Sequence, residues 1–175
     1  GGIGIIVMAV AVLPMLQVGG MQLFRLESSD NAEKILPRAT QLAGSLVLLY
    51  VIITMSCALA YNIGGMGLFD SLAHSLTTIS TGGYPTHTDS FAYFSNSNLE
   101  YIAVLFMIVG SLPFVLYLQF ARGKASSLFL DSQVLAFFTI LLVSVILCVL
   151  YIQNNADISS ADSIRKSLFN VTSIL

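Results

Sequence analysis

The chain has 175 residues, of which 56% are hydrophobic and 9% are charged. Soluble domains carry about 25% charged residues, so this composition is typical of a protein that crosses a membrane several times. The formal net charge of −2 is too small to indicate nucleic acid or an acidic molecule as a partner. The two cysteines, Cys57 and Cys148, lie in apolar runs and indicate neither a disulfide framework nor a metal site.

Long uncharged runs divide the chain. A helix needs about 20 apolar residues to cross the hydrocarbon core of a bilayer. The runs therefore predict spans near 3–23, 41–62, 99–120 and 134–153. The first run has no initiator Met and no basic segment before it, so it is not predicted to be a signal peptide. We expect the chain to be a fragment of a longer membrane protein.

The basic residues predict the orientation of these spans. Of the seven Lys and Arg residues, five lie in the segments 25–40 and 121–133, and none lies in 63–98. By the positive-inside rule, 25–40 and 121–133 are cytoplasmic loops and 63–98 is outside. Arg165 and Lys166 fall on the outer side and are exceptions to the rule.

Residues 68–80, LFDSLAHSLTTIS, predict a short helix that does not cross the membrane. An apolar stripe at helical spacing runs through Leu68, Leu72, Leu76 and Ile79, and Asp70 is expected to cap the first turn. A helix of this length reaches about 20 Å, which is short of the roughly 30 Å of a bilayer core. It is either a re-entrant helix that returns on the side it entered or an amphipathic helix lying flat at the interface.

The stretch TGGYP at 81–85 follows this helix directly. Its two glycines permit backbone angles that other residues rarely adopt, and Pro85 stiffens the exit. An extended 81–84 segment could point successive carbonyl oxygens toward one axis, where they would replace the water shell of a monovalent cation. The negative end of the short helix would favour a cation at the same place. A short helix, TGGY and a returning span together predict an ion filter.

A faint internal repeat accompanies this pattern. DSLAHSL at 70–76 matches DSIRKSL at 162–168, and Asn62 and Asn154 share the same offset. Both copies follow an outward-going span, so the repeat is parallel, and units of this kind can surround one pore axis. The filter of the second copy would lie beyond Leu175.

The segments GGIGIIVMAVAVLPMLQVGGMQLFRLE and LFDSLAHSLTTISTGGYPTHTDSFAYF resemble the TrkH family, the membrane subunits of bacterial Trk potassium uptake systems in the Trk/Ktr/HKT superfamily. The resemblance covers essentially the whole chain. It implies an all-α integral membrane fold of four K⁺-channel-like units around one pore. The resemblance implies an inner helix of the first unit at 1–24, a cytoplasmic loop at 25–40 and a complete second unit at 41–120. Within the second unit it implies spans at 41–62 and 99–120, a pore helix at 68–80 and a filter at 81–84. A second cytoplasmic loop at 121–133 and the outer and pore helices of a third unit at 134–175 follow.

The resemblance also implies which residues bind the ion. The filter glycine of the family falls on Gly83, and the K⁺-binding segment comprises Thr81, Gly82, Gly83 and Tyr84. Thr81 stands where an aliphatic residue is expected, but a backbone ligand does not depend on the side chain. The residues expected to support the filter from the pore helix are Asp70, His74 and Thr78.

Other expectations concern the surroundings of the site. Asp89 and Glu100 could concentrate cations at the outer mouth, or they could be solvated loop charges. Tyr61 and Tyr101 lie near span ends and are expected at membrane interfaces.

The resemblance implies a multi-pass protein of the bacterial inner membrane that is surrounded by lipid and forms a homodimer. It further implies a cytosolic nucleotide-binding regulatory subunit, TrkA. K⁺ is the transported ion, no cofactor is expected, and neither an enzymatic reaction nor a nucleic-acid partner is implied.

Three other functions remain open at this stage. His74, His87 and Asp89 could form a catalytic metal site, although the chain has no HExxH motif. A secondary transporter could bind its substrate at a broken helix near 77–84 through the hydroxyls of Thr77, Thr78, Ser80 and Thr81. A related Na⁺/K⁺ transporter would share the same sequence features.

Overall fold

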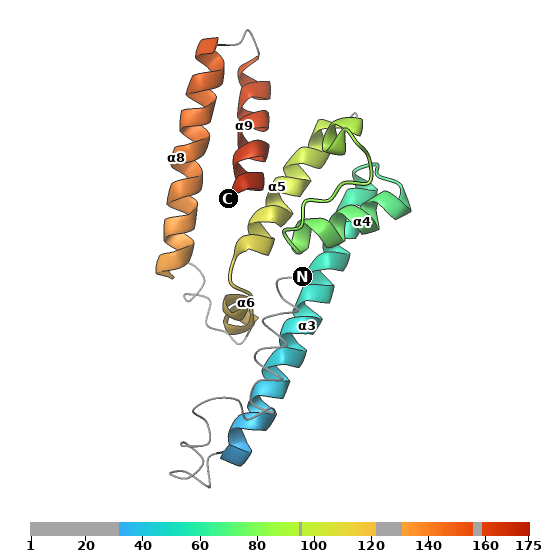
Figure 1. Ribbon diagram of the computed structural model, residues 1–175, viewed down its shortest axis with the longest axis vertical. Coiled ribbons are helices and arrows are strands. Elements are labelled where there is room, and N and C mark those ends of the chain that lie inside the picture. Colours follow the sequence, from blue (N-terminus) through green and yellow to red (C-terminus); the bar gives the residue numbers. More distant parts are fainter. Residues whose placement is uncertain (1–31, 95, 122–130, 156–158) are drawn as a thin grey trace. The chain divides into compact units, whose positions relative to one another are not determined.

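The computed structural model describes residues 32–94, 96–121, 131–155 and 159–175. The expected first span at 3–23 lies outside these residues, as do 25–31 and 122–130 of the expected cytoplasmic loops. Every regular element in the described ranges is a helix (Figure 1), which agrees with the predicted all-α fold. The elements are α3 (Ala32–Ile63), α4 (Leu68–Ile79), the 3₁₀ helix η1 (Ser90–Tyr93), α5 (Ser97–Ser111), α6 (Phe114–Ala121), α8 (Ser132–Asn155) and α9 (Ser160–Ile174).

The chain divides into two compact units, Gly1–Ile53 and Thr54–Leu175. The described part of the first unit is the α3 helix up to Ile53. That helix begins at Ala32, so residues 32–40, which were expected as a loop, are helical. Ala, Glu and Lys open this segment, and all three favour helix.

Two of the described helices are long and apolar enough to cross a membrane, judged by length and composition. They are Gly44–Ile63 and Ser132–Asn154. These segments coincide with the spans predicted at 41–62 and 134–153.

The span predicted at 99–120 is not one continuous helix in the structure. The structure has α5 up to Ser111 and α6 from Phe114, with Leu112 between them in an extended conformation (ψ 148°). The residue before a proline is pushed out of the helical region, so Pro113 accounts for the break. Across it, the Tyr117 hydroxyl donates to the Val109 carbonyl at 2.8 Å.

In the second unit, α5 packs against both α4 and α9, and α9 packs against α8 (Figure 1). Beyond the break, Leu112 and Leu116 form a small apolar cluster with Val134 of α8. At the other end of α5, the Asn96 side chain donates to the Gly64 carbonyl at 2.8 Å. Helix α5 is thus the element that both α4 and α9 contact.

Helix α4 buries its polar face. Leu68 and Leu76 of the predicted apolar stripe are 74% and 53% exposed, whereas His74 and Ser75 are at most 2% exposed. Only Ile79 of that stripe is buried. A buried polar face and an exposed apolar face are expected of a helix that lies between protein and lipid rather than in water.

Candidate functional site

Helix α4 ends in a hydrogen-bonded turn that directs the chain into the TGGY segment. The Thr77 carbonyl accepts from the backbone N–H of Gly82 at 2.8 Å, and the Thr78 carbonyl accepts from Thr81 at 3.2 Å. This pair of bonds is the Schellman motif that closes many helices. Thr81 occupies its left-handed position, with φ of 54°.

The prediction that residues 81–84 are extended is therefore wrong at Thr81, where the segment begins. Thr81 and Gly83 have φ of 54° and 67°, and they flank Gly82, whose φ is not in the left-handed region. A β-branched residue such as threonine rarely adopts positive φ, and strain of this kind costs on the order of 1–3 kcal/mol. Such strain persists where neighbouring bonds hold the backbone, as the two turn bonds to α4 do here.

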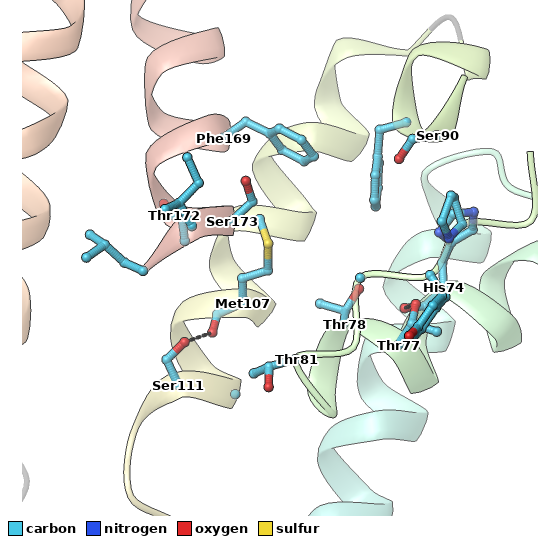
Figure 2. A pocket seen from close by; sticks show the side chains of 17 residues that line it. His74, Thr77, Thr78, Thr81, Ser90, Met107, Ser111, Phe169, Thr172 and Ser173 are labelled. Carbon is cyan, nitrogen blue, oxygen red and sulfur yellow. Dashed lines mark hydrogen bonds between the residues drawn. The ribbon is translucent and has the colours of Figure 1, made fainter. Parts of the chain in front are cut away.

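A cavity of about 800 Å³ opens beside this turn (Figure 2). The end of α4 and its loop line one side of it, α5 lines a second side, and the last turns of α9 line a third. Among the described residues that line it, none is Asp, Glu, Lys or Arg. The lining residues are His74, Thr77, Thr78, Thr81, Gly83, Tyr84, Pro85, Ser90, Phe91, Met107, Gly110, Ser111, Phe169, Thr172, Ser173, Ile174 and Leu175.

Gly110 lets α5 pass close to the end of α4. A Cβ at this position would lie 3.3 Å from the Ile79 carbonyl oxygen and 3.5 Å from Ile79 Cα. Both atoms belong to the backbone, which has little freedom to move away. The sequence interpretation did not single out Gly110, although a glycine in an apolar helix is typical of close helix packing.

A polar network lies behind the loop that follows the turn. The Thr86 hydroxyl donates to Asp70 Oδ1 at 2.7 Å, and His74 Nε2 lies 3.2 Å from the same hydroxyl oxygen. Because that hydroxyl gives its one proton to Asp70, it must accept from His74, so His74 carries its proton on Nε2. His87 Nε2 lies 3.4 Å from Asp70 Oδ1, an ion-pair distance without hydrogen-bond geometry.

This network corrects the expected role of Asp70. The residue before α4 is Gly67, and no side chain caps the helix start. Asp70 instead holds the loop through Thr86, and that hydrogen bond lowers the pKa of Asp70, with a further contribution from His87. Burial lowers the pKa of His74, which favours its neutral form.

Aromatic rings cover the network. Phe91 of η1 lies 5.2 Å from the His74 ring and 5.2 Å from Phe169 of α9, measured between ring centroids. His87 stacks on Tyr93 at 3.7 Å. The sequence interpretation did not assign these aromatic residues to the site, because nothing local to residues 90–94 indicates that they fold back over α4.

Thr78, predicted to support the filter, is buried and lies 2.9 Å from the Tyr61 hydroxyl. Tyr61 was expected at a membrane interface, but it is fully buried, so that expectation is wrong. Tyr101 is 45% exposed.

The remaining predicted site residues are not part of this network. Asp89 is exposed, precedes η1 and does not line the cavity. Within the described ranges, no group of three or more His, Cys, Asp or Glu side chains could hold a metal ion. The set of His74, His87 and Asp89 is accordingly not brought together as a metal site.

Two helices long and apolar enough to span a membrane, a short helix with a buried polar face and a cavity at its glycine-rich end are typical of polytopic membrane proteins. Residues 1–135 match the family profile of TrkH, described as a cation transport protein. The chain belongs to the TrkH family, and the resemblance inferred from the sequence is confirmed.

Several relatives extend this match over the rest of the chain. The chain is 41% identical to the Trk system potassium uptake protein TrkI of Halomonas elongata, over 100% of this chain and 36% of the relative. It is 37% identical to the Trk system potassium uptake protein TrkH of Salmonella typhimurium, over 99% of this chain and 37% of the relative.

A solved structure shares the fold. The crystal structure of the potassium transporter TrkH from Vibrio parahaemolyticus matches with a TM-score of 0.79 and 33% identity, over 99% of this chain and 35% of that chain. The chain thus spans between 35% and 37% of the length of these proteins.

Proposed function

We propose that the protein takes up K⁺ through a channel-like pore, and that Thr81, Gly82, Gly83 and Tyr84 form one segment of its selectivity filter. The observation that carries this proposal is the turned backbone at the end of α4, where Thr81 and Gly83 have positive φ and line the cavity. The names of the relatives, which are potassium uptake proteins and a potassium transporter, support K⁺ as the ion.

The chemistry of the cavity suits a dehydrated monovalent cation. Backbone carbonyls can replace the water that such an ion loses. The C-terminal end of α4 carries a partial negative charge of about half an elementary charge. No lysine or arginine is among the described lining residues to repel the ion.

The hydroxyl groups at the end of α4 favour a carbonyl filter over a side-chain substrate site. Thr77 Oγ1 donates to the His74 carbonyl at 3.1 Å, and Thr78 Oγ1 is paired with Tyr61 at 2.9 Å. Ser80 Oγ donates to the Thr77 carbonyl at 3.4 Å. The donor protons of Thr77 and Ser80 and the Thr78–Tyr61 pair are thus used within the protein, which favours a supporting role for these three hydroxyls.

We infer that Asp70, His74 and Thr78 support the filter through this network. The bond of Asp70 to Thr86 ties the loop after the filter to the first turn of α4. The bond of Thr78 to Tyr61 ties the last turn of α4 to α3. Asp89, an exposed carboxylate in the same loop, would raise the local cation concentration.

We further propose that 41–120 and 134–175 belong to successive parallel pore units. The repeat pairs Ser71 with Ser163 and Ser75 with Ser167, and all four are at most 2% exposed. On this proposal the protein is a multi-pass protein of the bacterial inner membrane that works as a homodimer with a cytosolic TrkA subunit. The names of the relatives, Trk system potassium uptake proteins, support a role within a Trk system.

The test compares Gly83→Asp with the wild type, each expressed from its own gene in a strain unable to take up K⁺. Gly65→Asp is a matched control, because Gly65 also has positive φ (106°) and is exposed but does not line the cavity. The readouts are growth at low K⁺, Rb⁺ uptake with and without excess Na⁺, and abundance in the membrane.

We expect Gly83→Asp to lose Rb⁺ uptake or its selectivity over Na⁺ at normal abundance, while Gly65→Asp keeps both. Wild-type transport by Gly83→Asp would overturn the filter assignment. If Gly65→Asp loses Rb⁺ uptake to the same extent, the effect of Gly83→Asp comes from strain at a positive-φ position and not from the filter.

A further inference from the structure

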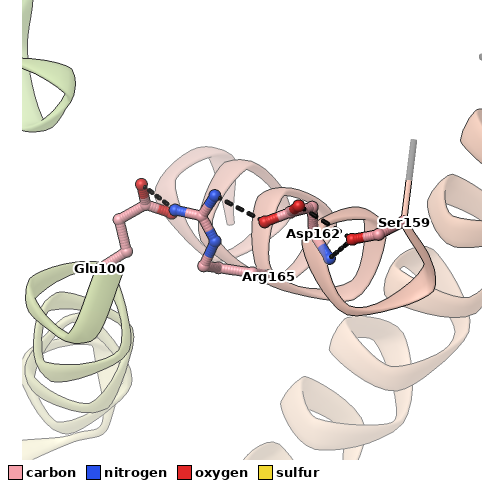
Figure 3. A network of polar contacts seen from close by, with 4 residues as sticks. All are labelled: Glu100, Ser159, Asp162 and Arg165. Atoms are coloured by element: carbon pink, nitrogen blue, oxygen red, sulfur yellow. Dashed lines mark hydrogen bonds and ion pairs between the residues drawn. The ribbon is translucent and has the colours of Figure 1, made fainter. Parts of the chain in front are cut away.

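Arg165 of α9 reaches across to α5 (Figure 3). Its Nη1 lies 2.6 Å from Glu100 Oε1, and its Nη2 lies 3.0 Å from Asp162 Oδ1. The side chains of Arg165 and Glu100 are only 16% and 20% exposed. One guanidinium thus holds carboxylates from two helices, and its planar fork directs a separate N–H donor at each of them.

Ser159, at the start of α9, orients the Asp162 carboxylate that accepts from Arg165 Nη2. Ser159 Oγ donates to Asp162 Oδ2 at 2.8 Å, and the backbone N–H of Asp162 donates back to Ser159 Oγ at 3.2 Å. This reciprocal cap fixes the Asp162 carboxylate on the helix. Glu100, in the first turn of α5, is the second anchor. Arg165 therefore joins the first turn of α9 to the first turn of α5.

The two short helices use the equivalent aspartate differently. The repeat aligns Asp162 with Asp70, and Arg165 with Ala73. Asp70 binds Thr86 in the loop that follows its own helix, whereas Asp162 binds an arginine that crosses to α5. Helix α4 is secured by its own loop, and α9 is secured by a helix of the preceding proposed unit.

The position of α9 bears directly on the cavity. Thr172 and Ser173 in its last turns line the same cavity as Thr81 and Gly83 (Figure 2). We propose that Arg165 is a positioning residue for ion selection: its fork sets α9 against α5 and thereby sets the distance between the last turns of α9 and the TGGY turn. This inference rests on the proposed transport function.

The test measures Rb⁺ uptake and its selectivity over Na⁺ in the protein expressed from its own gene, with abundance in the membrane as a control. The variants are Glu100→Gln, Arg165→Gln, their combination and Arg165→Lys. Lys166→Gln is the matched control, since it removes a neighbouring positive charge that is exposed.

We expect Glu100→Gln and Arg165→Gln each to reduce selectivity on the order of tenfold, the effect of losing one charge-assisted hydrogen bond. The double variant should be no worse than Arg165→Gln, because that change alone already breaks the contact with Glu100. Arg165→Lys keeps the charge but loses the planar fork, so it should retain only part of the wild-type selectivity. Lys166→Gln should keep wild-type selectivity.

Three results would overturn the positioning role: wild-type selectivity in Glu100→Gln, full function in Arg165→Lys, or an equal loss in Lys166→Gln. If Arg165→Gln fails to accumulate, Glu100→Gln decides the matter, because it leaves Arg165 paired with Asp162. If Gly83→Asp loses transport while the Glu100 and Arg165 variants keep wild-type selectivity, the positioning role of Arg165 is rejected and the proposed filter stands. Normal transport in Gly83→Asp would reject the proposed function itself.

Discussion

The Tyr61 hydroxyl lies 2.9 Å from Thr78 Oγ1 and joins the last turns of α3 to the end of α4. Tyr61 is 0% exposed and Thr78 is 8% exposed, so bulk water does not replace this bond when it is broken. Thr78 lies three residues before Thr81, and its carbonyl accepts the Thr81 N–H. The side chain and the backbone of Thr78 thus connect buried packing to the strained turn.

Tyr61→Phe should lower the free energy of unfolding by about 1–2 kcal/mol, because it leaves a buried hydroxyl without its partner. Thr78→Val should have a similar effect. The double variant should cost less than the sum of the two single changes, since both remove one bond. Thermal unfolding in detergent measures all three, and strictly additive effects would contradict the coupling of these residues.

Gly110→Ala should destabilise the protein and reduce Rb⁺ uptake, because the new methyl group meets the Ile79 carbonyl at 3.3 Å. Gly110→Val should be worse, since overpacking of close helix contacts typically costs about 1–3 kcal/mol. Gly44→Ala is the control, because no atom lies within 4 Å of a Cβ placed there. Equal tolerance of alanine at 44 and 110 in thermal unfolding would show that the α4–α5 contact can relax.

Thr81→Gly should stabilise the turn by about 1 kcal/mol, because glycine adopts positive φ without the steric cost that a β-branched residue pays. Rb⁺ uptake should persist, since the proposed ligand is the backbone carbonyl. Thr81→Val keeps the branching and should gain no stability. Loss of uptake in Thr81→Gly at normal abundance would instead assign the Thr81 hydroxyl a direct role.

The bond from Thr86 makes the stabilising effect of Asp70 depend on pH. Because the pKa of Asp70 is lower in the folded protein, its contribution is complete above the unfolded value of about 3.9 and is lost as pH falls through the folded pKa. The difference in Tm between wild type and Asp70→Asn should therefore shrink below about pH 4. Thr86→Val, which removes the largest cause of the shift, should weaken this pH dependence.

Much of the local structure follows from local sequence signals. The short helix predicted at 68–80 is observed at Leu68–Ile79, and the span predicted at 134–153 lies within Ser132–Asn155. Uncharged runs and the Gly and Pro residues that end them act within a few residues, so they can be interpreted without the fold. The break at Pro113 is encoded in the same way, but the span predicted at 99–120 did not take this proline into account.

Sequence alone determined the membrane character of this protein, the place of its short helix and its membership of the TrkH family. The tertiary structure decided which face of α4 is buried, why Thr81 takes a left-handed backbone and which residues Arg165 contacts. By its sequence, Arg165 was an exception to the charge rule; in the fold it pairs with Glu100, 65 residues away. A contact over that separation depends on how α5 and α9 pack, and neither helix carries a local signal for its partner.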